Sequence, residues 1–239
     1  MKAKMDGMRA AFVVTIMLAG LVTACVSQVP RVPPNEEQHP EAFPEAFYLQ
    51  DAARGHPVFR IEPAMSLVVI EVRRAGSLAR LGHDHVVASH GVHGYVAPDE
   101  GRADLYVRLD ALVVDEPELR AQAAFDTQPD EAAIAGTREN MLAQLHAEEH
   151  PYALIHAQMA EAGANDPQVS VAITVNGITR EVRTPLQIEK GDTRLNVSGR
   201  MSLAQSDFGI APLSILGGAL QVQDRVELRF VIIANRLSP

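Results

Sequence analysis

The sequence of 239 residues has one cysteine, no tryptophan and few aromatic residues, which together make up 5% of the chain. Since Cys25 has no second cysteine to pair with, no disulfide forms within the chain. Common catalytic and phosphate-binding motifs are missing too, among them the Gly-x-Ser-x-Gly elbow, the glycine-rich phosphate loop and His-Glu-x-x-His. These absences argue against an enzyme, and we expect no cofactor.

The chain is also short of positive charge. Its 21 Lys and Arg face 30 Asp and Glu, a formal net charge of −9 at pH 7. The acidic residues are dispersed along the chain, as on a solvated surface. Because such a surface repels phosphates and anionic head groups, nucleic acid is excluded as a partner and an anionic membrane surface is disfavoured.

The apolar run at residues 10–22 would form a helix of roughly 20 Å, too short for a hydrocarbon core of about 30 Å. It follows three basic residues and ends in Val-Thr-Ala-Cys at residues 22–25, which is typical of a secretory signal and resembles a bacterial lipobox. This predicts a signal peptide over residues 1–24 and a lipid anchor on Cys25, several acyl chains on one residue being enough for firm attachment. A lipidated Cys25 can be neither a disulfide partner nor a nucleophile. The alternative is an ordinary secretory signal with a chance cysteine.

Residue 26 is Val rather than Asp. By resemblance to Gram-negative lipoproteins, this favours the outer membrane over retention in the inner membrane. We therefore expect the protein in the cell envelope, lipid-anchored at the periplasmic face of the outer membrane.

Residues 25–57 are rich in proline, with Glu, Gln and His between the prolines. Such a composition cannot bury a core, so these residues are predicted to form a disordered tether. The folded domain is expected over residues 58–236. Phe43, Phe47 and Tyr48 are the aromatic residues of the tether and could dock a short segment onto the domain.

Alternating apolar and polar residues, the pattern of half-buried antiparallel strands, dominate the chain from Phe59 onward. Turn sequences separate the strands at residues 97–101, 176–177 and 190–192, and Asn-Gly at 176–177 is a strong hairpin signal. Residues 130–146 instead place Ile134, Met141, Leu142 and Leu145 at a helical spacing, with Thr127 or Asp130 as the cap. About eight strands and one inserted helix predict an all-β, antiparallel, lipocalin-like barrel. A two-sheet sandwich is the structural alternative.

His83 and His85 stand at i and i+2, a spacing that places both side chains on one face of a strand and suits a transition metal. His93 is the candidate third ligand if the strand continues without a bulge. The other interpretation, which we prefer, is that His83 and His85 make polar contacts at the mouth of the barrel. No metal site and no catalytic residue is predicted on this interpretation.

Several segments of the chain resemble the YceI-like family of lipocalin-like barrels, which is associated with polyisoprenoid or other lipid binding. They are Phe59-Arg60-Ile61-Glu62 leading into Ser66, Arg80-Leu81-Gly82-His83-Asp84-His85, His150-Pro151-Tyr152, Val175-Asn176-Gly177-Ile178-Thr179-Arg180, Ser206-Asp207-Phe208-Gly209-Ile210 and Val222-Gln223-Asp224-Arg225-Val226. The resemblance covers residues 59–235 and implies a barrel that holds an isoprenoid-like chain in an apolar channel.

The resulting prediction is an envelope protein that binds a long apolar ligand, and attaches to the membrane through its N-terminus. Its alternatives are a histidine-based metal-binding or redox-associated protein and a structural lipoprotein with a packed barrel. The sequence does not predict the identity of the ligand, a partner protein or an oligomeric state. The candidate ligand-binding residues are His83, His85, Leu105, Val107, Leu109, Val197, Met201, Leu228 and Phe230.

Overall fold

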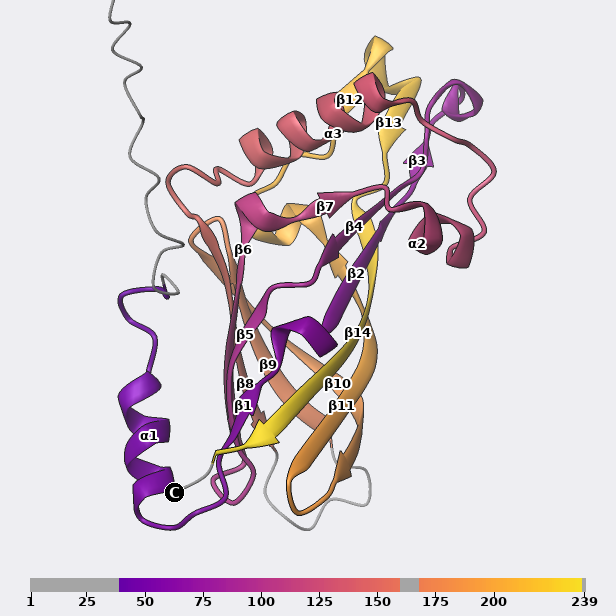
Figure 1. The fold of residues 1–239 in the computed structure, drawn as a ribbon. Coiled ribbons are helices and arrows are strands. Elements are labelled where there is room, and N and C mark those ends of the chain that lie inside the picture. Colours follow the sequence, from indigo (N-terminus) through magenta and orange to yellow (C-terminus); the bar gives the residue numbers. More distant parts are fainter. Residues whose placement is uncertain (1–38, 160–167, 238–239) are drawn as a thin grey trace, which may run out of the picture. The chain divides into compact units, whose positions relative to one another are not determined.

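The computed structural model describes residues 39–159 and 168–237. Eight of their strands pair antiparallel in the order β1-β5-β6-β8-β9-β10-β11-β14, and β1 pairs with β14 to close the ring (Figure 1). The expected barrel is confirmed, and the two-sheet sandwich is excluded. The barrel strands are β1 (Phe59–Ile61), β5 (Val92–Ala97), β6 (Arg102–Arg108), β8 (Tyr152–Met159), β9 (Gln168–Val175), β10 (Ile178–Lys190), β11 (Arg194–Ala204) and β14 (Arg225–Arg236).

The pairing of β11 with β14 shows how the alternation builds the barrel wall. Val197 lies opposite Ile232 and Met201 opposite Leu228, so apolar side chains of both strands share one face. Between them, Gly199 lies opposite Phe230, and a Cβ atom at residue 199 would stand 2.7 Å from Cζ of the Phe230 ring. The glycine therefore makes room for the phenylalanine ring.

The predicted hairpin turns are confirmed. Asn176 and Gly177 connect β9 to β10 with φ of 53° and 69°, the positive values that a two-residue turn of type I′ requires. Gly101 donates its N–H to the carbonyl of Pro98 (3.1 Å) in the turn from β5 to β6, and Gly191 closes the turn from β10 to β11.

Further strands extend the sheet beyond the barrel. β2, β4 and β7 continue from β14, and a separate three-stranded sheet has the order β12-β13-β3. These strands are β2 (Leu67–Val72), β3 (Arg74–Ala75), β4 (His85–Ser89), β7 (Val113–Val114), β12 (Ser214–Ile215) and β13 (Leu220–Val222). The short 3-10 helices are η1 (Pro63–Met65), η2 (Ala79–Leu81), η3 (Leu109–Ala111), η4 (Gln205–Phe208) and η5 (Leu216–Gly218).

The predicted helix is confirmed as α3 (Glu131–Gln144), and a short helix, α2 (Pro117–Gln122), precedes it. Asp130 caps α3 by accepting a hydrogen bond from the N–H of Ala133 (2.8 Å). The helix lies across one end of the barrel, opposite the turn between β10 and β11 (Figure 1). Among the described residues, no helix has both the length and the apolar character needed to cross a membrane.

The predicted boundary between tether and domain is wrong, because residues 39–57 are part of the fold. They contain helix α1 (Glu45–Ala53), in which Tyr48 is 0% exposed and donates a hydrogen bond to Asp104 of β6 (2.6 Å). Pro44 does not disrupt the helix because it stands at its N-terminal cap, where a missing N–H costs nothing. The rest of the predicted tether, residues 25–38, lies outside the described residues, as does the predicted signal peptide.

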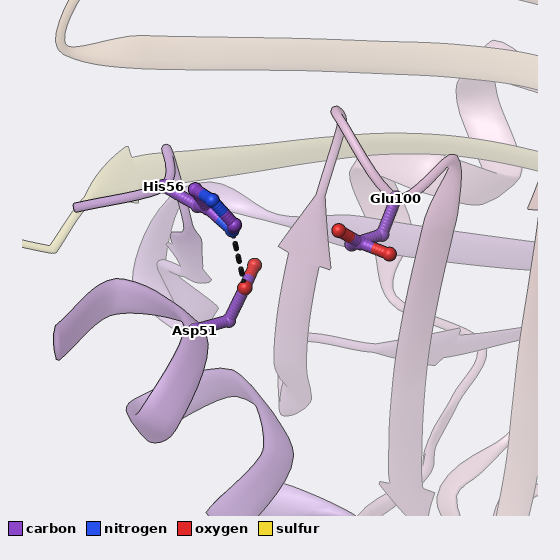
Figure 2. A group of neighbouring side chains, drawn as sticks. All are labelled: Asp51, His56 and Glu100. Carbon is purple, nitrogen blue, oxygen red and sulfur yellow. Dashed lines mark hydrogen bonds and ion pairs between the residues drawn. The ribbon is translucent and has the colours of Figure 1, made fainter. Parts of the chain in front are cut away.

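At the C-terminal end of α1, the carboxylate of Asp51 accepts a hydrogen bond from Nδ1 of His56 (2.6 Å; Figure 2). This contact fixes the connection between α1 and β1. Behind it, Tyr48, Val58, Tyr95 and Ala97 form a small core between α1 and the outer face of the barrel.

Candidate functional site: an apolar cavity inside the barrel

The barrel encloses a cavity of about 690 Å³. This volume falls within the range of about 300–1,000 Å³ that is usual for small-molecule sites. Valine, leucine, isoleucine, alanine and methionine side chains supply most of the wall. All seven apolar residues named from the sequence line it: Leu105, Val107, Leu109, Val197, Met201, Leu228 and Phe230. Their contact with a ligand stays a prediction.

The charged residues of the cavity wall are Arg102 and Lys190. Arg102 begins β6 and Lys190 ends β10, so both stand at the barrel end that carries the β5–β6 and β10–β11 turns. The guanidinium of Arg102 bonds Asp104 (2.7 Å) and covers the ring of Phe47, whereas Nζ of Lys190 lies 3.5 Å from Asp99. The guanidinium of Arg102 thus lies with Asp104 and Phe47 on the outer face, and Lys190 is the charged group near this end of a mostly apolar cavity.

At the opposite end, apolar residues of α3 close the barrel. Ile134, Met141, Leu142 and Leu145 pack against the cluster that contains Leu109 and Leu112, two residues of the cavity wall. These four are the residues whose spacing predicted the helix, so the apolar face of α3 covers the interior. The cavity is therefore apolar and covered at this end, and Lys190 stands near the other.

His83 and His85 do not line the cavity, so their predicted place at its polar end is not what the structure shows. His85 belongs to β4, in the sheet extension, and its Nδ1 is 2.6 Å from Oδ2 of Asp115. Its Nε2 lies 3.5 Å from Oγ1 of Thr137 on α3. Nδ1 of His83 is buried without a hydrogen-bond partner. The i and i+2 spacing predicted both histidines on one face of a strand, but β4 begins only at His85 and His83 precedes it. The spacing also could not show that β4 lies outside the barrel.

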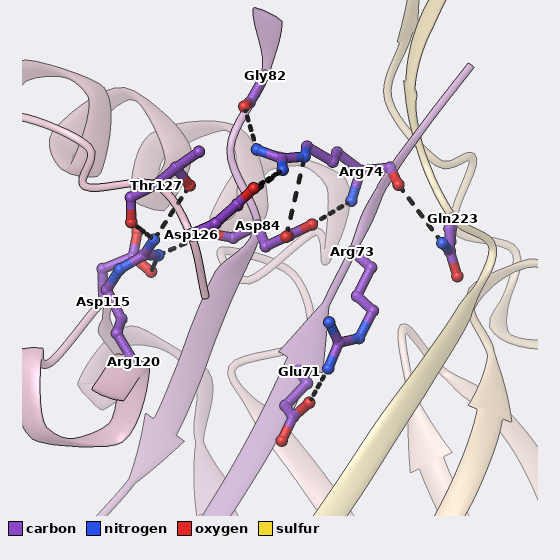
Figure 3. A network of polar contacts seen from close by, with 10 residues as sticks. All are labelled: Glu71, Arg73, Arg74, Gly82, Asp84, Asp115, Arg120, Asp126, Thr127 and Gln223. Carbon is purple, nitrogen blue, oxygen red and sulfur yellow. Dashed lines mark hydrogen bonds and ion pairs between the residues drawn. The ribbon is translucent and has the colours of Figure 1, made fainter. Parts of the chain in front are cut away.

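Asp115 belongs to a polar network outside the cavity, of which Figure 3 shows the part around Arg120 and Thr127. Besides His85, it accepts hydrogen bonds from Arg120 and from the N–H of Val86. Arg120 also donates to the carbonyls of Asp84 and Thr127, which ties β4 to the segment before α3. The network satisfies buried charge, and it holds Asp115 at a φ of 60°, which is uncommon for a residue other than glycine.

The alternative metal site of His83, His85 and His93 does not assemble. His93 lies on β5, where its ring stacks on that of Tyr106 with 5.2 Å between centroids. The rings of His83 and His85 are 6.2 Å apart, and Asp115 occupies Nδ1 of His85. Within residues 39–159 and 168–237, these three histidines do not bring ligand atoms within 4.8 Å of one another.

In a comparison with known protein families, the YceI-like domain matches residues 63–234, which include nearly all of the barrel. The chain belongs to the YceI-like family. A comparison with curated proteins found no match. Among solved structures, BcnA of Burkholderia cenocepacia is 15% identical, covering 72% of this chain and 98% of its own, with a TM-score of 0.46. The YCEI protein of Campylobacter jejuni is 16% identical, covering 57% and 73%, with a TM-score of 0.36.

This YceI-like protein has a second polar network, on the outer face of the barrel, which the sequence did not reveal. Asp104 of β6 accepts hydrogen bonds from Tyr48 and Arg102, and Nδ1 of His156 on β8 is 2.7 Å from its Oδ1. Burial and the hydrogen bond to Asp104 raise the pKa of Tyr48, so the phenol stays protonated. In the same way, burial and the hydrogen bond to Glu45 raise the pKa of Tyr95 to about 12.

Asp115 and Asp104 are expected to make the fold sensitive to acid. Burial alone would raise the pKa of each, but the hydrogen bonds from their partners outweigh it and hold both pKa values below the usual range. Each carboxylate therefore stabilises the fold above an unfolded-state pKa of about 3.9, and this contribution is lost as the pH falls through the lower folded-state pKa. We expect the free energy of unfolding to fall steeply below about pH 4.

The Asp115→Asn variant tests the assignment, because it keeps the shape of the side chain and removes its titration. Urea unfolding from pH 7 to pH 3 should give a shallower acid loss than in the wild type. A variant whose unfolding free energy parallels that of the wild type at every pH would show that Asp115 makes no such contribution.

Proposed function

We propose that this YceI-like protein binds one long apolar molecule, an isoprenoid-like chain or another lipid, inside the barrel, and that it is not an enzyme. The observation that carries the proposal is the cavity of about 690 Å³ with an almost wholly aliphatic wall. Burial of ten methylene groups would contribute about 8 kcal/mol before the costs of ordering the ligand. Binding therefore needs no cofactor and no covalent step.

The direct test is to purify the protein from its own membrane and analyse an organic extract by mass spectrometry. The proposal predicts roughly one molecule of a long-chain lipid per protein chain. A purified protein that carries no lipid and binds none when lipids are added would favour the alternative, a structural lipoprotein.

The ligand is expected to lie with its head group near Lys190 and its tail toward α3. Of the two charged residues of the wall, Lys190 is the less engaged. Its ammonium group has a 3.5 Å contact to Asp99 at an exposed site, whereas Arg102 is bonded to Asp104. An anionic head group would gain a charge-assisted contact there.

We predict that Lys190→Gln weakens binding of an anionic lipid several-fold more than binding of the matching neutral lipid. The measurement is the displacement of a bound fluorescent fatty acid, once by an unlabelled fatty acid and once by the fatty alcohol of the same chain length. Equal effects on both lipids would place the head group elsewhere.

The lipid anchor at Cys25 is a second part of the proposal, supported by the lipobox-like sequence. We propose that the mature protein begins at Cys25 and is held at the periplasmic face of the outer membrane. The Cys25→Ser variant is expected to leave the membrane fraction or to accumulate as an uncleaved precursor. Fractionation with immunodetection measures both, and a variant that is processed and sediments like the wild type would refute the anchor.

A further inference from the structure

Asp51, His56 and Glu100 form a cluster at the outer edge of the barrel (Figure 2). Asp51 lies in α1, His56 in the connection to β1, and Glu100 in the turn from β5 to β6. Each side chain offers one ligand atom, and these three atoms lie within 4.8 Å of one another. The cluster thus brings together two segments that are far apart in the sequence.

Asp51 distinguishes this cluster from a chance group of surface charges. The residue is 3% exposed, and its Oδ2 is buried with no hydrogen-bond partner, while Oδ1 accepts from His56. A buried carboxylate oxygen without a partner is costly, and a bound cation would satisfy it. Asp51 also stands near the C-terminal end of α1, where the helix dipole favours positive charge.

We propose that Asp51, His56 and Glu100 bind a divalent transition-metal ion, with Zn²⁺ as the best-suited probe. One imidazole nitrogen and two carboxylate oxygens suit zinc and its neighbours, whereas Ca²⁺ and Mg²⁺ favour oxygen ligands alone. Two negative charges and a neutral ring also match a divalent cation. The exposed side chains of His56 and Glu100 leave the fourth position to water.

The fit needs only small movements. Ligands about 2.1 Å from zinc in a tetrahedral site are separated by about 3.4 Å, so atoms that lie within 4.8 Å of one another need to close by at most about 1.4 Å. Nδ1 of His56 is already 2.6 Å from Oδ1 of Asp51, and that hydrogen bond would be exchanged for the bonds to the metal. His56 and Glu100 are exposed and can change rotamer, which allows the buried Asp51 to stay in place. The ion would then link α1 to the β5–β6 turn, whose Pro98 and Gly101 line the cavity.

The experiment uses the full chain, freed of metal by dialysis against a chelator and then titrated with ZnCl₂. We expect one tightly bound zinc per chain, measured by mass spectrometry of the bound metal, and a melting temperature raised by several degrees. His56→Gln and Glu100→Gln should each weaken zinc binding at least tenfold and remove the thermal shift. Both changes are at exposed positions, so the fold should survive them.

His90 and Glu116 provide the matched control, since they form another His–Glu pair, 2.8 Å apart, in which His90 is exposed and Glu116 is half-buried. His90→Gln and Glu116→Gln should keep the zinc and the thermal shift of the wild type. Every variant retains Cys25 and the other histidines, so zinc held elsewhere contributes equally to all of them. The proposal is overturned if the wild type takes up no stoichiometric zinc, or if His56→Gln and Glu100→Gln bind it as the wild type does.

Discussion

Replacement of Tyr48 by alanine is expected to lower the free energy of unfolding by about 3–5 kcal/mol, the range for removing a large aromatic side chain from a core. Tyr48 is 0% exposed, and its ring stacks on Tyr95 with 5.3 Å between centroids. The substitution also removes the hydrogen bond to Asp104, which leaves a buried carboxylate with one donor fewer. Urea unfolding at neutral pH measures the loss.

Two further variants separate the causes. Tyr48→Phe keeps the ring and loses only the hydroxyl, so about 1.5–3 kcal/mol should be lost through the bond to the charged carboxylate. Leu49→Ala, at the neighbouring position of α1, removes a side chain that is 48% exposed and should change stability by about 0.5 kcal/mol or less. If Tyr48→Ala were as harmless as Leu49→Ala, α1 would not be part of the cooperatively folded unit. The prediction of a tether that extends to residue 57 would then be correct.

Helix α1 was not predicted from the sequence, because residues 39–57 carry two conflicting signals. Proline at residues 40, 44 and 57 is typical of an extended linker. Phe47 and Tyr48 instead lie in α1, and Phe43, just before its N-cap Pro44, packs in the same small core. Composition outweighed spacing in the prediction, although three aromatics in a chain that has few of them were the better guide.

The barrel was predictable because its strands carry the alternation themselves. Each strand of the wall gives its own parity, and the Asn176-Gly177 turn fixes which strands are neighbours. The place of His83 and His85 was not predictable in this way. Parity says which side chains share a face, but it does not say that β4 pairs with β2 and β7 outside the barrel. β7 in particular is separated from β4 in the sequence by the barrel strands β5 and β6. The partnership of His85 with Asp115 follows from that same long-range pairing.

Val197→Trp is expected to weaken binding of a long apolar ligand by about a hundredfold. Val197 pairs with Ile188 on one side and Ile232 on the other, and all three residues line the cavity. An indole ring in place of the valine side chain would occupy space that the ligand otherwise fills. If it excludes four methylene groups, the loss is about 3 kcal/mol, and each 1.4 kcal/mol corresponds to a tenfold change.

Ser198→Trp is the matched control, because the next residue of β11 points to the other face of the wall and is absent from the cavity lining. Titration with a fluorescent polyene fatty acid measures both variants, and thermal unfolding verifies that each remains folded. Loss of affinity in Val197→Trp with near-normal affinity in Ser198→Trp would locate the ligand inside the barrel. If both variants are folded and bind like the wild type, the apolar ligand binds outside the cavity. The cavity would then be a space in the barrel that no ligand fills.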